Sequence, residues 1–297
     1  MGDLLITGCS QLLTLRGSAP RRGRALSDLS LIRDGALLVR NDRILAAGTR
    51  RRIERMRETR RAERLDLGGR VVLPGFVDSH THLIFPASRA DEYERRINGE
   101  TYEQIARSGG GIRATVEKLH RATPEALRDR ALGALRRFAA HGTTTLEAKT
   151  GYGLDWKSEL KTLQILHELH ERQPLDIVPT FLGAHVVPRE FQRRPDAFVD
   201  ILVRRWIPAV ATSGLADFCD VFCARGAFSV AQARRILVAA RKCGLVPRIH
   251  AEQLAHTGAA RLAIELEAAS ADHLERLNRD DIRALALSNV VCTLLPG

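Results

Sequence analysis

From residue 71 onward, the chain alternates between two kinds of apolar segment. Short, almost continuous apolar runs are typical of buried strands, and longer segments with helical spacing of their apolar positions separate them. We predict strands at residues 71–78, 143–148, 177–184, 218–223, 246–250, 268–273 and 289–295, and helices at 123–142, 158–173, 195–211, 229–243, 258–267 and 280–287. Seven strands in series with helical crossovers indicate a parallel α/β architecture.

The first 70 residues follow a different pattern. Short apolar segments predict strands, and residues 36–39 and 44–47 flank the turn pair Asn41-Asp42, which predicts a hairpin. The sequence therefore predicts two domains, a small β-sandwich-like domain at 1–70 and a larger α/β domain at 71–297.

The larger domain can be a doubly wound sheet or a barrel. A nucleotide-binding doubly wound sheet carries Gly-x-Gly-x-x-Gly after its first strand, and this chain has no such motif there. Polar residues instead follow the ends of several different predicted strands, which is where a (β/α)8 TIM-type barrel builds its active site. We therefore predict a TIM-type barrel.

Composition and charge exclude several classes of partner. The 297 residues carry a net charge of +11, and 41 of the 46 basic residues are Arg. The densest basic stretch, residues 50–64, interleaves Arg with Glu, which is typical of a solvated helical face; a phosphate-binding surface is the alternative. No zinc-finger spacing or RNP-like aromatic motif indicates nucleic-acid binding.

No apolar run reaches the ~18 residues of a membrane span, and the start lacks a basic signal-peptide region, so we expect a cytoplasmic protein with no membrane partner.

The strongest chemical signal is the segment Pro-Gly-Phe-Val-Asp-Ser-His-Thr-His at residues 74–82. Residues i and i+2 of a strand point to the same face, so His80 and His82 can converge on one metal ion. An apolar strand that ends in this way, entered by Pro-Gly, resembles the first barrel strand of the amidohydrolase superfamily.

Two later histidines also end predicted strands. His250 ends the strand at 246–250, and a third imidazole of this kind suits zinc or ferrous iron. His273 ends the strand at 268–273, where it is placed to act as a base or to contact a substrate. The sequence therefore predicts a histidine-rich metal site at the carboxyl ends of the strands.

A series of further motifs narrows the resemblance. Phe-Pro-Ala-Ser-Arg at 85–89, Ser-Gly-Gly-Gly-Ile at 108–112, Lys-Thr-Gly-Tyr-Gly-Leu at 149–154, Phe-Leu-Gly-Ala-His at 181–185 and His-Ala-Glu-Gln at 250–253 follow one another along the chain. Together with the first-strand motif they are similar to the imidazolonepropionase family, the ring-opening hydrolases of histidine degradation. The resemblance covers nearly the whole chain.

The resemblance implies a role for each matching residue. Metal ligands would be His80, His82 and His250, holding one Zn2+ or iron ion (Fe2+/Fe3+) per subunit. Substrate contacts would be Arg89, Tyr152, His185 and Gln253, with catalytic acid/base roles for Glu252 and His273. The substrate, 4-imidazolone-5-propanoate, carries a carboxylate, and an arginine guanidinium such as that of Arg89 binds a carboxylate in bidentate fashion.

The resemblance also implies a mechanism. A metal-activated water attacks the ring carbonyl carbon, the metal or His185 stabilises the developing negative charge on oxygen, and Glu252 passes a proton to the leaving ring nitrogen. The product is N-formimidoyl-L-glutamate. The partner is thus a small molecule.

The family pattern continues beyond Gly297. In that family an eighth strand carries the fourth metal ligand, an Asp, and C-terminal strands complete the small β domain. We therefore expect a truncated form, with half of the small domain and a barrel that is incomplete after strand 7. Its open strand edges favour a homodimer as one possible state. Two alternatives stay open: another amidohydrolase, such as a deaminase or a dihydroorotase-like enzyme, and an inactive amidohydrolase scaffold.

Overall fold

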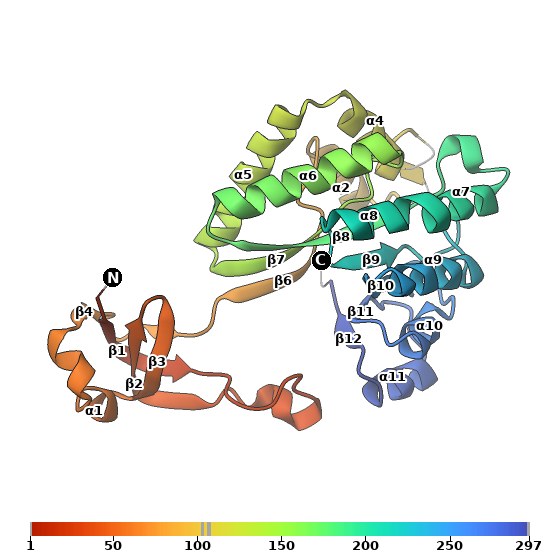
Figure 1. The fold of residues 1–297 in the computed structure, drawn as a ribbon. Coiled ribbons are helices and arrows are strands. Elements are labelled where there is room, and N and C mark those ends of the chain that lie inside the picture. Colours follow the sequence, from red (N-terminus) through yellow and green to blue (C-terminus); the bar gives the residue numbers. More distant parts are fainter. Residues whose placement is uncertain (1, 102–103, 106–107, 296–297) are drawn as a thin grey trace. The chain divides into compact units, whose positions relative to one another are not determined.

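The computed structural model describes residues 2–101, 104–105 and 108–295. The chain divides into two compact units, Met1–Gly75 and Phe76–Gly297 (Figure 1). Among the described residues, we find no helix with the length and apolar character needed to cross a bilayer.

The first unit is a mixed sheet. Its strands are β1 (Leu4–Leu13), β2 (Leu31–Arg40), β3 (Arg43–Thr49), β4 (Glu63–Asp66) and β5 (Val71–Val72), in the order β3-β2-β1-β4, with β5 also paired to β1. The predicted hairpin is present: β2 and β3 are antiparallel, and Asn41 and Asp42 between them both have positive φ. A two-residue turn of that kind matches the twist of the two strands. Leu5, Leu38 and Ile53 belong to one of its two buried clusters, and Leu12 belongs to the other.

The basic stretch of the sequence belongs to this unit. It forms one helical turn, α1 (Arg50–Ile53), and a 3-10 helix, Arg57–Arg61, before it enters β4. Its arginines are exposed, as predicted for a solvated face. The expected helical face is not one continuous helix: residues 54–56 separate α1 from the 3-10 helix, and from residue 63 the chain extends to pair with β1.

The second unit is an incomplete barrel of seven parallel strands. These are β6 (Phe76–Thr81), β7 (Thr143–Lys149), β8 (Asp176–Ala184), β9 (Phe218–Val221), β10 (Val246–Ala251), β11 (Ser270–His273) and β12 (Val291–Thr293), which pair in sequence order. The predicted TIM-type architecture is confirmed. Within the described part of the chain, β6 and β12 end the sheet, and a groove of about 510 Å³ lies between them.

Helices follow the strands and pack on the outer side of the barrel (Figure 1). They are α2 (Ala90–Ile97), α4 (Gly111–Arg121), α5 (Pro124–Ala140), α6 (Trp156–Arg172), α7 (Pro195–Ile201), α8 (Ile207–Ser213), α9 (Val230–Lys242), α10 (Ala259–Glu265) and α11 (Arg279–Ala286). Capping signals start several of them: the side chains of Thr123, Asp155 and Ser229 each accept a hydrogen bond from the first turn of their helix. The main core lies between strands and helices and includes Phe181 and Phe198.

Two predicted elements differ from the structure. The strand predicted at 71–78 is two strands, because β5 pairs with β1 in the first unit whereas β6 starts the barrel. Pro74 and Gly75 separate them, since proline lacks the N–H that a continuing strand needs. The helix predicted at 195–211 is interrupted by a π-helical turn, Leu202–Trp206, just before Pro208, whose missing N–H removes an α-helical hydrogen bond.

Candidate active site

Three histidines gather inside the barrel. His80 lies on β6, His82 follows it, and His250 lies on β10, so the curvature of the sheet brings together residues from strands that are not neighbours. One ring nitrogen from each lies within 4.8 Å of the other two. This spacing suits coordination of a single ion.

The histidines are chemically suited to a metal. His80 Nδ1 lies 2.7 Å from Asp272 Oδ2 and His250 Nδ1 lies 3.0 Å from Asp220 Oδ2. The hydrogen bond of His80 to Asp272 keeps the proton on Nδ1 and leaves Nε2 unprotonated, as a metal ligand must be. The His250–Asp220 contact is close but lacks hydrogen-bond geometry among the described residues. Burial lowers the pKa of His80 and of His82, so both rings are neutral. Among the described residues, the buried Nδ1 of His82 has no hydrogen-bond partner, which is costly unless a ligand meets it.

A cavity of about 300 Å³ opens over the three histidines. Its lining includes eight of the nine residues that the sequence predicts for the site: His80, His82, Arg89, Tyr152, His185, His250, Gln253 and His273. The predicted residue that does not line it is Glu252. Segments distant in the sequence therefore meet at the carboxyl ends of the barrel strands, where this architecture places active sites.

Tyr152 and His185 form an aromatic wall beside His82. Their ring centroids lie 5.1 Å apart, and each lies within 5.3 Å of the centroid of His82. His185 is buried, and its Nδ1 donates to the carbonyl oxygen of Gly151 at 2.9 Å. Burial, and secondarily repulsion from His250, lower the pKa of His185 to about 3, so the ring is neutral at physiological pH.

A buried carboxylate holds the loop that carries Tyr152. Glu159 on α6 accepts hydrogen bonds from the backbone N–H groups of Gly151, Gly153 and Leu154 at 3.0, 2.8 and 2.9 Å. Burial raises its pKa, and the backbone donors act against that rise. A fixed loop keeps the tyrosine ring in one place.

Arg89 follows the metal ligands His80 and His82 along the chain and lies just before α2. Its guanidinium donates to the Glu92 carboxylate, through Nε at 2.8 Å and also through an Nη. Glu92 in turn accepts from Gly111 N at 3.0 Å. The arginine is thereby oriented, and it lines the cavity with only part of its side chain exposed.

His273 faces the histidine cluster from β11. Its ring centroid lies 5.2 Å from those of both His80 and His250, and its Nδ1 lies 3.1 Å from Glu275 Oε1. Burial lowers its pKa. The residue has φ +80°, a left-handed conformation that is uncommon outside glycine and that recurs at functional sites.

Glu252 does not occupy the place expected from the sequence. Its carboxylate is buried and accepts hydrogen bonds from Thr257 N, Thr257 Oγ1, Gly258 N and Ala260 N at 2.5–3.2 Å. Both oxygens are thus engaged at the start of α10. The side chain anchors the loop after His250, and this geometry does not supply the proton transfer expected of it.

The sequence did not assign Lys149 or Asp220 to the site. The two side chains are fully buried and 2.8 Å apart, and Asp220 also contacts His250. The available signals were a lysine at the end of an apolar strand, in a chain with only five lysines, and an aspartate inside the predicted strand at 218–223.

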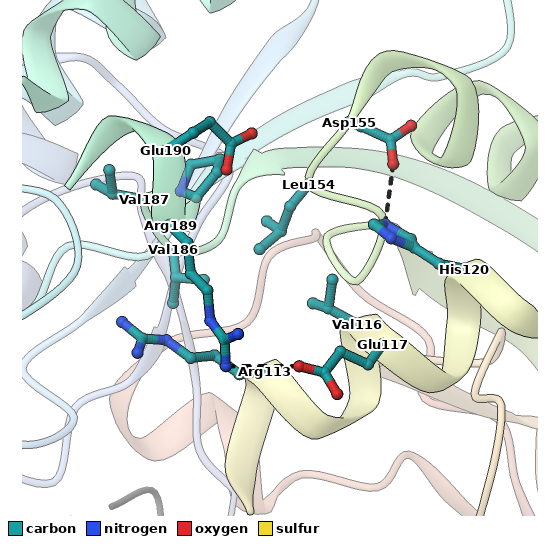
Figure 2. A pocket seen from close by; sticks show the side chains of 11 residues that line it. Arg113, Val116, Glu117, His120, Leu154, Asp155, Val186, Val187, Arg189 and Glu190 are labelled. Carbon is teal, nitrogen blue, oxygen red and sulfur yellow. Dashed lines mark ion pairs between the residues drawn. The ribbon is translucent and has the colours of Figure 1, made fainter. Parts of the chain in front are cut away.

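A second pocket, of about 210 Å³, lies between α4, residues 154–155 and residues 186–190. Figure 2 shows Arg189 turned toward Glu117 and His120 turned toward Asp155, at 3.5 and 2.9 Å. The acidic and basic side chains that line this pocket thus pair with one another.

Comparison with known proteins agrees with the fold and with the residues. The model of the Amidohydrolase family matches residues 71–296. The imidazolonepropionases of Alkaliphilus metalliredigens, Geobacillus kaustophilus and Symbiobacterium thermophilum are 42%, 44% and 46% identical to this chain, across 99–100% of it and 70–71% of their own length.

Solved structures share the fold at low identity. The chain superposes on 5-methylcytosine deaminase from Klebsiella pneumoniae with a TM-score of 0.64 at 17% identity, covering 97% of this chain and 65% of that one. For a triazine hydrolase from Arthrobacter aurescens the TM-score is 0.62 at 15% identity, covering 100% and 66%. Identity, coverage and fold lead to one conclusion: the chain belongs to the amidohydrolase family and, within it, to the imidazolonepropionases.

Proposed function

We propose that this protein hydrolyses the ring C–N bond of 4-imidazolone-5-propanoate to give N-formimidoyl-L-glutamate, a step of histidine degradation. The observation that carries the proposal is the three-histidine cluster beneath a cavity lined by Arg89, Tyr152 and His185, in a chain 42–46% identical to the three imidazolonepropionases named above. The cavity of about 300 Å³ suits a small cyclic substrate.

His80, His82 and His250 would hold one divalent metal ion, zinc or iron. Neutral imidazoles are ligands for either metal. When bound, such an ion supplies a nucleophilic water at neutral pH and a Lewis acid next to the substrate carbonyl.

Arg89 would bind the propanoate group of the substrate. The planar guanidinium carries five N–H donors in a fork that matches a carboxylate, and Arg89 lines the cavity. Tyr152 and Gln253 add polar groups on the same cavity, through a phenolic hydroxyl and an amide.

His185 would accept a hydrogen bond from the substrate ring. Its Nδ1 proton is used by Gly151 O, so the neutral imidazole has an unprotonated Nε2, which accepts and cannot donate. An N–H of the imidazolone ring matches this group. The role expected from the sequence, donation to the developing oxyanion, does not suit this tautomer.

His273 would move the proton. Glu275 holds the Nδ1 proton, so Nε2 of the neutral ring can take a proton from the attacking water. Water oxygen then adds to the ring carbonyl carbon, the bond from that carbon to the ring nitrogen breaks, and His273 returns the proton to the departing nitrogen. The Glu275 carboxylate stabilises the transient imidazolium.

The proposal is tested by turnover of candidate substrates. The metal-loaded protein that carries this chain is incubated with 4-imidazolone-5-propanoate, and separately with cytosine, guanine and dihydroorotate, and the products are identified by mass spectrometry. We expect N-formimidoyl-L-glutamate from the first compound, with one oxygen from labelled water in its new carboxyl group. Preferential turnover of any of the other three would overturn the assignment.

A further inference from the structure

The two carboxylates that contact the metal-site histidines meet at a single ammonium group. Lys149 Nζ lies 2.8 Å from Asp220 Oδ2 and 3.3 Å from Asp272 Oδ2. A third contact, at 2.9 Å, joins it to Glu147 Oε1. An ammonium group has three N–H donors, so these acceptors match its full hydrogen-bonding capacity.

Each aspartate also contacts one of the metal-site histidines. The same Oδ2 of Asp220 that contacts Lys149 lies 3.0 Å from His250 Nδ1, and the same Oδ2 of Asp272 lies 2.7 Å from His80 Nδ1. Two chains of contacts therefore start from one nitrogen and end on two of the three histidines.

The barrel explains this juxtaposition. In such barrels the interior is filled in layers to which alternate strands contribute. Here β6 and β10 supply the histidines, whereas β7, β9 and β11 supply Lys149, Asp220 and Asp272. We call Lys149, Asp220 and Asp272 the supporting layer, because the two aspartates contact the histidines and the lysine contacts both aspartates.

The net charge of the supporting layer also favours a cation at the three histidines. Arg248 joins the cluster through Asp272 at 3.1 Å, so two cations face three carboxylates and one negative charge is left over. Burial opposes the charged form of Lys149, but Asp220 and Glu147 outweigh this and raise its pKa, so the ammonium persists in the interior. Buried charges of this kind persist only when they are paired.

We propose that Lys149 is a positioning residue for the metal centre, which fixes Asp220 and Asp272 so that His250 and His80 present unprotonated nitrogens to one ion. This inference rests on the metal site of the proposed function and is independent of the identity of the substrate. Removal of the ammonium leaves two buried carboxylates without their shared partner, so both histidines lose their fixed orientation.

The test measures metal binding without any substrate. In Lys149→Met, competition with a chelating indicator should show Zn2+ affinity lower by about 10- to 100-fold, the usual effect of losing an outer partner of a metal ligand. The visible spectrum of the Co2+-substituted protein should change in position or intensity. Lys161→Met is the matched control, because Lys161 lies on α6 and donates to the backbone carbonyls of Leu119 and Ala122, away from the histidines. It should leave affinity and spectrum unchanged.

A double variant separates positioning from general damage. If Lys149 acts through Asp220, then Lys149→Met in the Asp220→Asn background should lower Zn2+ affinity by much less than it does in the wild type. Additive losses in this cycle, or a folded Lys149→Met protein with wild-type affinity and spectrum, would overturn the proposal.

Two further readouts cover the remaining outcomes. If Lys149→Met does not fold, Asp220→Asn alone decides: lower affinity supports the proposal and unchanged affinity overturns it. A protein that shows the expected metal effects but no hydrolysis of 4-imidazolone-5-propanoate would contradict the proposed function and leave the role of Lys149 intact.

Discussion

His185 Nδ1 donates to the carbonyl oxygen of Gly151 at 2.9 Å, and this contact fixes which nitrogen of the ring can serve a substrate. The loop after β7, which contains Gly151, therefore determines the tautomer of His185, which follows β8. Glu159 holds the same loop through three backbone N–H groups, so the tautomer of His185 depends on a carboxylate outside the cavity.

The first prediction concerns His185 as an acceptor. In His185→Phe, the ring N–H of the substrate loses its partner, and kcat/KM should fall by about 5- to 150-fold, which corresponds to about 1–3 kcal/mol for an unsatisfied buried group. Steady-state kinetics at pH 7 measure this. An unchanged kcat/KM would remove His185 from substrate recognition.

A second prediction follows from the pKa of about 3 for His185. The native protein holds this ring neutral, whereas the unfolded chain protonates it below about pH 6.5. The unfolded state therefore binds more protons between these values, and stability falls as pH falls from about 6.5 toward 3. Urea midpoints of metal-free protein should decline over this range, less steeply in His185→Gln. Parallel slopes in the two proteins would contradict the assigned shift.

The third prediction concerns the substrate carboxylate. Arg89→Met should lower kcat/KM, and the corresponding loss of transition-state stabilisation should be about 1.5–3 kcal/mol, the range for a hydrogen bond to a charged group. An amide analogue of the substrate, which lacks the negative charge, should be much less sensitive to the same change. Equal losses for both compounds would place the propanoate elsewhere.

The fourth prediction separates anchoring from catalysis at Glu252. Glu252→Gln replaces an acceptor of several backbone N–H groups by a side chain with one acceptor oxygen, so the free energy of unfolding should fall by about 1–3 kcal/mol. Because the carboxylate does not line the cavity, kcat per metal-loaded site should be largely retained. A kcat loss of about 100-fold or more at unchanged stability would restore the proton-transfer role expected from sequence.

The sequence predicts the frame of the molecule well because its signals are local. Alternating strand and helix patterns predicted the parallel α/β architecture, polar residues at the strand ends favoured the barrel, and the i, i+2 rule placed His80 and His82 on one face. The role of Glu252 came from the family resemblance, which does not state where the side chain points. β10 ends at Ala251, and φ of +53° at Glu252 turns the chain out of the strand.

The supporting layer that contacts the histidines could not be predicted from the sequence, for a different reason. Lys149, Asp220 and Asp272 are separated by some 50–70 residues each, and only the curvature of the sheet makes them neighbours. A charged residue inside a predicted strand conflicts with local patterning, and such conflicts are expected at functional sites. They mark a position as unusual without naming its partner.

The central claim is that one metal ion, held by His80, His82 and His250, is required for hydrolysis of 4-imidazolone-5-propanoate. The most direct measurement is to titrate the metal-free protein with Zn2+, and in parallel with Fe2+, and to follow the initial rate of hydrolysis. The account predicts a rate that rises with added metal to a plateau at one equivalent per chain, and no such rise in His80→Ala or His250→Ala, whereas His120→Ala behaves like the wild type. Full activity of the metal-free protein, or a normal titration of His250→Ala, would contradict it.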